Sequence, residues 1–74
     1  MKENDRLERL YQQTILSLEK NQMEKMEIQK KISDPKIKAM DVHKLSTAIK
    51  NFAQTIDYEI KTLKTLSLVL EKNE

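Results

Sequence analysis

A heptad repeat between Val42 and Leu70 constrains this chain more than any other feature. Apolar residues recur at alternating spacings of three and four, so that they fill nearly every first (a) and fourth (d) heptad position: Val42, Leu45, Ile49, Phe52, Ile56, Leu63, Leu66 and Leu70. Glu59 interrupts the d positions, and Ile60 beside it widens the apolar face. Because this spacing places side chains on one side of an α-helix, the stretch predicts a helix that buries this side against other helices.

A weaker repeat predicts an earlier helix over residues of about 4–32. Its seam, meaning the line of side chains that faces the partner helix, consists of Leu7, Tyr11, Thr14, Leu18, Asn21, Lys25, Ile28 and Ile32. Leu16, Met23 and Met26 fall outside the seam and form an apolar patch elsewhere on this helix. Since methionine adapts to varied surfaces, the patch either binds a partner protein or fills a gap inside an oligomer.

The sequence Ser33-Asp34-Pro35 marks a bend. Proline disfavours the helical state of the residue before it, so the first helix ends here. We expect Asp34 to cap the second helix, with Pro35 at its first position. The bend then covers residues of about 33–36 and the second helix about 36–72; a start at Asp41, with a longer link, is the alternative. A short link makes the two helices antiparallel neighbours.

Two registers of the helix pair, one heptad apart, satisfy the two repeats. A tight turn sets Leu18 opposite Phe52 and Tyr11 opposite Glu59, whereas a longer link sets Leu18 opposite Glu59. Burying a carboxylate against leucine is costly, so we expect the tight register, in which Glu59 has a hydroxyl partner. Glu59 is either a buried polar residue that fixes the register or the partner, or an exposed residue tolerated at the end of the overlap.

The length of the chain predicts that the hairpin associates. Its 74 residues form one domain, residues 1–74, whose single core supplies no more than about 3–5 kcal/mol. There is no Cys and only one His, so we expect neither a disulfide nor a bound metal ion to stabilise the fold. Apart from Asp41, the flanks of the second seam carry small or uncharged side chains, where a two-stranded coiled coil usually carries Glu and Lys. These flanks indicate contact with a second chain, although a solvated flank is the alternative.

The predicted fold class is therefore all-α, a two-helix antiparallel coiled-coil hairpin that oligomerises into a helical bundle or ring. The predicted hairpin and self-association residues are Val42, Leu45, Ile49, Phe52, Ile56, Glu59, Ile60, Leu63, Leu66 and Leu70 with Leu7, Tyr11, Leu18 and Ile28.

Few residues point to catalysis or to other partners. The chain has no glycine and hence no phosphate-cradling loop, and it has no cysteine nucleophile, so we expect no enzyme and no cofactor. The side chains of Asp41 and His43 diverge on a helix, which makes them a poor catalytic pair. Apolar runs are too short to span a membrane, and the N-terminus lacks the apolar core of a secretory signal. These features predict a cytoplasmic protein that does not contact membranes.

Five lysines surround the bend and are candidates for contact with an anion: Lys30, Lys31, Lys36, Lys38 and Lys44. The net charge is only +2, and no aromatic residue lies between these lysines to stack on bases. We therefore expect ordinary solvated lysines, with contact to nucleic acid as the weaker alternative.

The bend and the start of the second repeat resemble a known family. Asp34-Pro35-Lys36-Ile37-Lys38 and Leu45-Ser46-Thr47-Ala48-Ile49-Lys50 are similar to the central oligomerisation hairpin of phage terminase small subunits. That family assembles into rings through such hairpins and recognises viral DNA for packaging. The resemblance implies that five residues lie in hairpin and subunit contacts: Leu45, Ile49, Phe52, Ile56 and Leu63. The family's N-terminal helix-turn-helix domain has no counterpart in these residues, so we expect either the isolated oligomerisation part or a stand-alone protein of similar shape, and DNA recognition is not implied.

The function expected from the sequence is a non-enzymatic module for protein–protein interaction and oligomerisation, related to terminase small-subunit assembly. The alternative is a small phage or mobile-element adaptor or inhibitor that binds another protein, either terminase-like or a host factor, through Leu16, Met23 and Met26.

Overall fold

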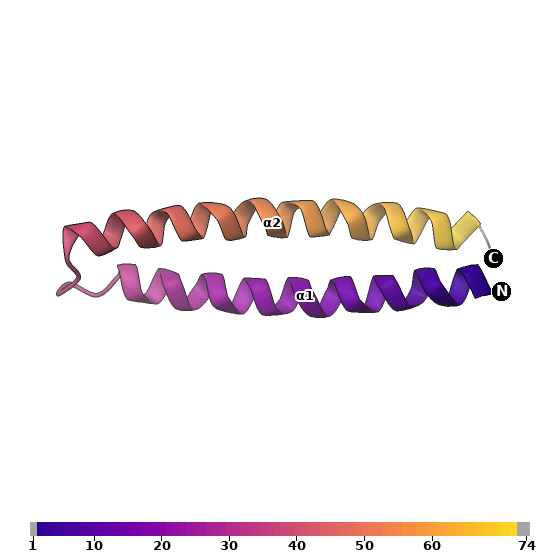
Figure 1. The fold of residues 1–74 in the computed structure, drawn as a ribbon, viewed down its shortest axis with the longest axis horizontal. Helices are drawn as coiled ribbons and strands as arrows, with labels where there is room; N and C mark the ends of the chain where they lie inside the picture. The colour runs from indigo at the N-terminus through magenta and orange to yellow at the C-terminus, as the bar shows by residue number, and fades with distance from the viewer. Residues whose placement is uncertain (1, 73–74) are drawn as a thin grey trace.

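The computed structural model describes residues 2–72, which form two long helices. Helix α1 spans Lys2–Ile32 and helix α2 spans Ala39–Lys72. The helices lie side by side and run in opposite directions, so the start of α1 and the end of α2 are at the same end of the rod (Figure 1). The predicted all-helical fold of two packed helices is confirmed. Met1, Asn73 and Glu74, which the predicted domain included, lie outside the described residues.

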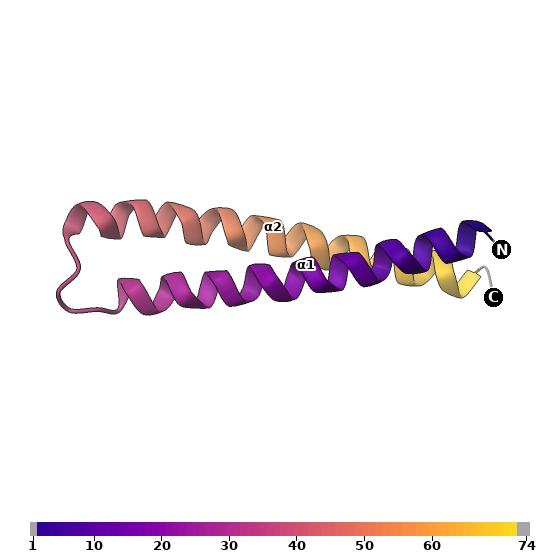
Figure 2. The ribbon, with the colours of Figure 1, turned by 60° about the horizontal axis from the view of Figure 1, so that its bottom comes forward.

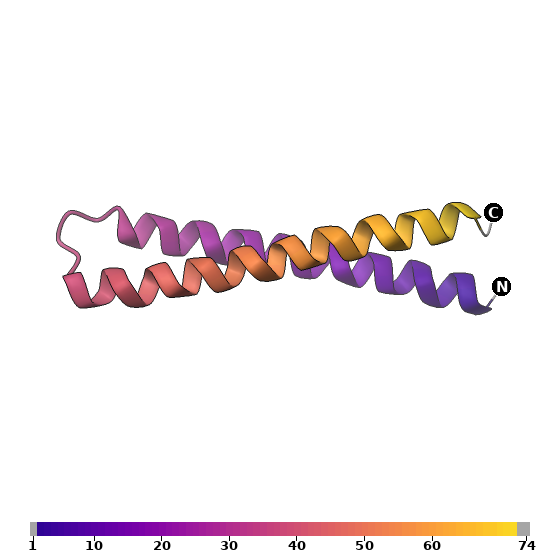
Figure 3. The ribbon, with the colours of Figure 1, turned by 90° about the horizontal axis from the view of Figure 1, so that it is seen from above.

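The helices cross at a shallow angle and do not lie straight beside each other. Figures 2 and 3 show one helix passing obliquely across the other between the bend and the free ends. The rod measures 55 × 14 × 13 Å. Each helix therefore has one neighbour along its whole length, and its remaining sides face outward.

Asp34 does not cap α2, so this part of the prediction is wrong. The Asp34 carboxylate instead accepts a hydrogen bond from the Lys36 N–H (3.0 Å), and its carbonyl accepts one from the Ile37 N–H (3.1 Å). These bonds form a β-turn with Pro35 at its second position, where proline is favoured. None of the described residues has a positive φ. The bend therefore forms without glycine, the residue that adopts a positive φ most readily.

Helix α2 begins later than the favoured start at residue 36 and earlier than the alternative start at Asp41. The Lys38 carbonyl accepts hydrogen bonds from the N–H groups of Asp41 and Val42 (both 3.0 Å), so Lys38 occupies the N-cap position. The link between the helices covers residues 33–38. It is longer than the tight turn, because Asp34 and Pro35 are used by the β-turn.

The tight register is also wrong, as the hydrogen bond from Asn21 Nδ2 to Glu59 Oε1 (2.8 Å) shows. The tight register would set Glu59 opposite Tyr11, about 15 Å along the axis from Asn21. The longer link sets Glu59 opposite Leu18, within one turn of Asn21. Figure 1 shows the corresponding stagger, in which α2 begins beyond the end of α1.

The observed register gives the helices a longer overlap. In the tight register Leu66 and Leu70 would extend past the residues of the α1 seam, whereas in the observed register they lie opposite Tyr11 and Leu7. Leu66 is only 7% exposed. Burying one leucine fully stabilises a protein by about 1.5–3 kcal/mol, so two added leucine layers outweigh a better partner for Glu59.

We predict that paired cysteines will report this register. Ile28→Cys with Ile49→Cys should form an intramolecular disulfide on oxidation, because the two positions face each other. Ile28→Cys with Val42→Cys is the matched control, since the register displaces this pair by about 10 Å, beyond the reach of a disulfide. Gel mobility under non-reducing conditions measures the outcome. Cross-linking of the control pair alone would contradict the register.

Candidate protein-interaction surfaces

The predicted seam residues line the contact between the helices, but few are fully covered. Leu66 (7% exposed) and Glu59 (8% exposed) are buried, and Ile60 lies exposed at the edge. The other seam residues are half-buried: Val42, Leu45, Ile49, Phe52, Ile56, Leu63 and Leu70 on α2, with Leu7, Tyr11, Thr14, Leu18, Asn21, Lys25, Ile28 and Ile32 on α1. The contact is therefore one side-chain layer deep and open on both flanks.

Glu59 and Asn21 form a polar layer within this seam. Theirs is the single hydrogen bond between side chains of the two helices in residues 2–72. The sequence predicted Asn21 as a seam position but did not pair it with Glu59, because only residues directly opposite each other were compared. Asn21 lies one turn away from the position opposite Glu59, and its side chain bridges that step.

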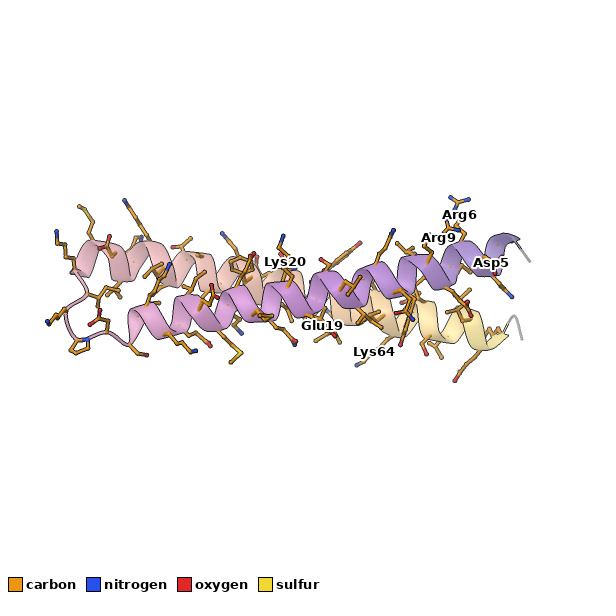
Figure 4. The ribbon with its side chains drawn as sticks, turned by 90° about the horizontal axis from the view of Figure 1, so that it is seen from below. Asp5, Arg6, Arg9, Glu19, Lys20 and Lys64 are labelled. Carbon is orange, nitrogen blue, oxygen red and sulfur yellow. The ribbon has the colours of Figure 1, made fainter. Side chains whose placement is uncertain are left out.

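The seam leaves two long edges on the hairpin. Figure 4 shows Glu19 of α1 and Lys64 of α2 pointing to one side, and Arg6 and Lys20 of α1 pointing to the other. The first side we call the Ile60 edge; on α2 it consists of Ser46, Lys50, Ala53, Asp57, Ile60, Lys64, Ser67 and Glu71. The second side we call the Tyr58 edge; on α2 it consists of Ala48, Asn51, Thr55, Tyr58, Thr62, Thr65 and Val69.

The Ile60 edge is hollowed near the free ends of the helices. Lys64, Ser67 and Glu71 of α2 line an open depression together with Tyr11 of α1. A second depression also includes Tyr11 and is lined further by Asp5, Glu8, Arg9, Gln12 and Leu70. Both depressions are lined by charged as well as uncharged side chains. On α2 the charged residues of this edge lie further from the seam than the uncharged ones, along what we call its rim.

The Tyr58 edge is uncharged on α2 between Ala48 and Val69. The Thr62 hydroxyl donates to the Tyr58 carbonyl (3.0 Å) and the Thr65 hydroxyl to the Lys61 carbonyl (3.2 Å). Both hydroxyl groups already donate hydrogen bonds within their own helix, so a partner that covered them would leave no donor without an acceptor. Tyr58 itself is 72% exposed.

The predicted apolar patch on α1 is open to solvent. Leu16, Met23 and Met26 are 66%, 65% and 57% exposed. Their spacings of seven and three residues place them along one line of the helix. This line faces away from α2, so the patch takes no part in the hairpin.

The bend gathers four of the five predicted anion-contact lysines. Lys31, Lys36, Lys38 and Lys44 line one open hollow, together with Asp34, Asp41, Ile37 and Leu45. Lys30 is separate and lies beside Met26 and Ser33. Four lysines and two aspartates give the hollow a formal charge of +2.

Within residues 2–72, neither helix holds an apolar stretch long enough to cross a membrane. No three His, Asp or Glu side chains of this part of the chain are grouped as metal ligands. Comparison with protein-family models, with curated proteins and with solved structures finds no significant match. The resemblance to terminase small subunits therefore stays a prediction from the residues of the bend.

We predict that Asn21→Leu destabilises the hairpin by about 1–3 kcal/mol, since it leaves the buried Glu59 side chain without its donor. The double variant Asn21→Leu with Glu59→Leu should recover this loss, because both polar groups are removed together. Urea unfolding at one fixed protein concentration measures both. A single variant as stable as the parent would show that Glu59 does not depend on Asn21.

Proposed function

We propose that this chain is a non-enzymatic self-association module, in which further copies complete the hairpin into an antiparallel coiled-coil bundle. The surface area of the single chain supports this proposal most directly. A compact monomer of 8.8 kDa exposes about 4,800 Å², whereas this chain exposes 6299 Å², an excess of about 1,500 Å².

The excess matches what association would cover. A stable interface removes about 800 Å² from each partner, so one further copy covers roughly half of the excess and a bundle or ring covers the rest. The half-buried seam side chains provide the driving force, at about 25 cal/mol for each Å² of apolar surface removed from water. Further copies would bind at the open flanks of the seam, because no segment of residues 2–72 packs there.

The bend sequence extends the proposal to a biological setting. The likeness of residues 34–38 and 45–50 to the terminase small-subunit hairpin supports a role in assembling a ring for phage DNA packaging. In this proposal the protein acts in the cytoplasm, and Leu45, Ile49, Phe52, Ile56 and Leu63 take part in hairpin and subunit contacts.

We predict that sedimentation equilibrium of the chain at micromolar concentration gives a mass of at least two copies. The circular dichroism spectrum recorded on the same samples should show the helix content of the hairpin. A mass of one copy, with the helices fully formed, would refute self-association, because the hairpin would then be stable with its flanks open.

The exposed α1 patch favours a second candidate function, an adaptor that binds a different protein. A polar triple variant, Leu16→Gln, Met23→Gln and Met26→Gln, separates the two uses of the patch. If the patch serves another protein, the variant keeps the sedimentation mass of the parent, since these residues face away from α2. A fall in mass would assign the patch to the oligomer and remove the adaptor function.

A further inference from the structure

The rim of the Ile60 edge carries charges of alternating sign. Lys50, Asp57, Lys64 and Glu71 follow one another at seven-residue spacing, which is about two helical turns. They therefore lie along one line of α2, with signs plus, minus, plus, minus. Read from the other end, the same line gives minus, plus, minus, plus.

Because the order of charges read from one end is the opposite of the order read from the other, the line is complementary to an antiparallel copy of itself. Lys50 then meets Glu71 of the second copy, and Asp57 meets Lys64 of the second copy. A two-fold axis repeats both pairs, so each dimer contains four opposite-charge contacts. A parallel arrangement in register would instead set every charge opposite its own kind, which is unfavourable.

We propose that a second copy of this chain docks on the Ile60 edge, with the two α2 helices antiparallel across a two-fold axis near Ile60. The proposal rests on the self-association proposed above and specifies its surface and orientation. Inside the charged line, the axis sets Ile60 opposite Ile60 and Ala53 opposite Ser67. The small side chains at the second pair allow the helices to approach closely, and Ile60 gains the apolar cover that its own hairpin does not give.

The Tyr58 edge is less suited to the same arrangement. An antiparallel pair of α2 helices centred on Tyr58 would set Lys44 near Lys72 of the second copy at both ends. Between Ala48 and Val69 this edge of α2 is uncharged, so Asp41, one turn before Lys44, is the one acidic residue of this edge of α2 that can offset the repulsion. Charge complementarity therefore selects the Ile60 edge.

The positions of the two bends agree with this orientation. Each bend hollow carries a formal charge of +2, and an antiparallel dimer about an axis near Ile60 separates the two bends by about 60 Å, since α2 begins 21 residues before Ile60. That distance exceeds the screening length of about 8 Å at physiological ionic strength. The opposite arrangement, with both bends at one end, would bring the lysine-lined hollows together.

The docked state requires little rearrangement of the charged rim. Asp57 Oδ2 lies 3.2 Å from Lys61 Nζ in the single hairpin, and these side chains are 65% and 75% exposed. An exposed pair of this kind contributes little, so Asp57 is free to turn to a new partner. On α1 the same edge carries the uncharged Ile15 and Gln22 and also Glu19, which points to this side in Figure 4 and adds a negative charge beside the charged line of α2.

Charge reversal tests the arrangement. Asp57→Lys and Lys64→Asp each turn two attractive contacts of the dimer into repulsive ones, so each variant alone should associate about tenfold more weakly. An equimolar mixture of the two should regain the affinity of the parent, because the substituted residue of each chain then faces its opposite charge in the other. The double variant should regain it as well. Sedimentation equilibrium at low and physiological salt measures all four samples.

Two controls fix the position of the surface. Lys20→Asp makes the same charge change on the other side of the hairpin, so it should leave association unchanged. Ile60→Cys should cross-link two copies on oxidation, whereas Tyr58→Cys should not. Circular dichroism of each variant shows whether the helices are retained.

The outcomes separate this surface from self-association itself. A parent chain of one-copy mass would refute both proposals. A parent that associates, with no recovery in the mixture and cross-linking at Tyr58→Cys, would refute the Ile60 edge and leave self-association standing.

Discussion

A helix that has a single neighbour can cover only one line of its side chains, and this limit governs the whole hairpin. The heptad seams of α1 and α2 meet along nearly their full length, yet among the apolar side chains of residues 2–72 only Leu66 is buried. The other apolar side chains of the seams are half-buried, apart from the exposed Ile60. Because the entropy of ordering some seventy residues must be offset by burial, such a thin core leaves little net stability. The open flanks are therefore the part of the molecule on which the proposed self-association depends.

The polar layer of Asn21 and Glu59 acts within this seam in a different way from the leucines. A buried polar pair contributes little net stability, and in coiled coils such a pair often selects one alignment over its neighbours. A shift of one heptad to the tight register would remove Asn21 from Glu59 and withdraw Leu66 and Leu70 from α1. Two separate free-energy costs therefore oppose this shift: the loss of the hydrogen bond between Asn21 and Glu59, and the exposure of Leu66 and Leu70.

The sequence predicted the inward-facing residues well because the heptad spacing alone determines which side of a helix is apolar. The seam positions of both helices, apart from Ile60, are buried or half-buried in the structure. The register and the start of α2 depended instead on competition between alternative local interactions, which the heptad spacing does not decide. Asp34 suits both a helix cap and a β-turn, and the turn prevailed. The predicted register paired Glu59 only with the residue directly opposite it. It therefore missed the diagonal neighbour Asn21 and gave too little weight to the burial of two leucine layers.

We propose that folding and association of this hairpin are coupled, and the concentration dependence of unfolding is the most direct test of this coupling. The midpoint of thermal or urea unfolding of the unmodified chain should rise steadily over about a hundredfold range of protein concentration, since mass action favours an associated native state. A midpoint that stays constant over that range, together with a one-copy mass, would show that two helices suffice and would contradict the account.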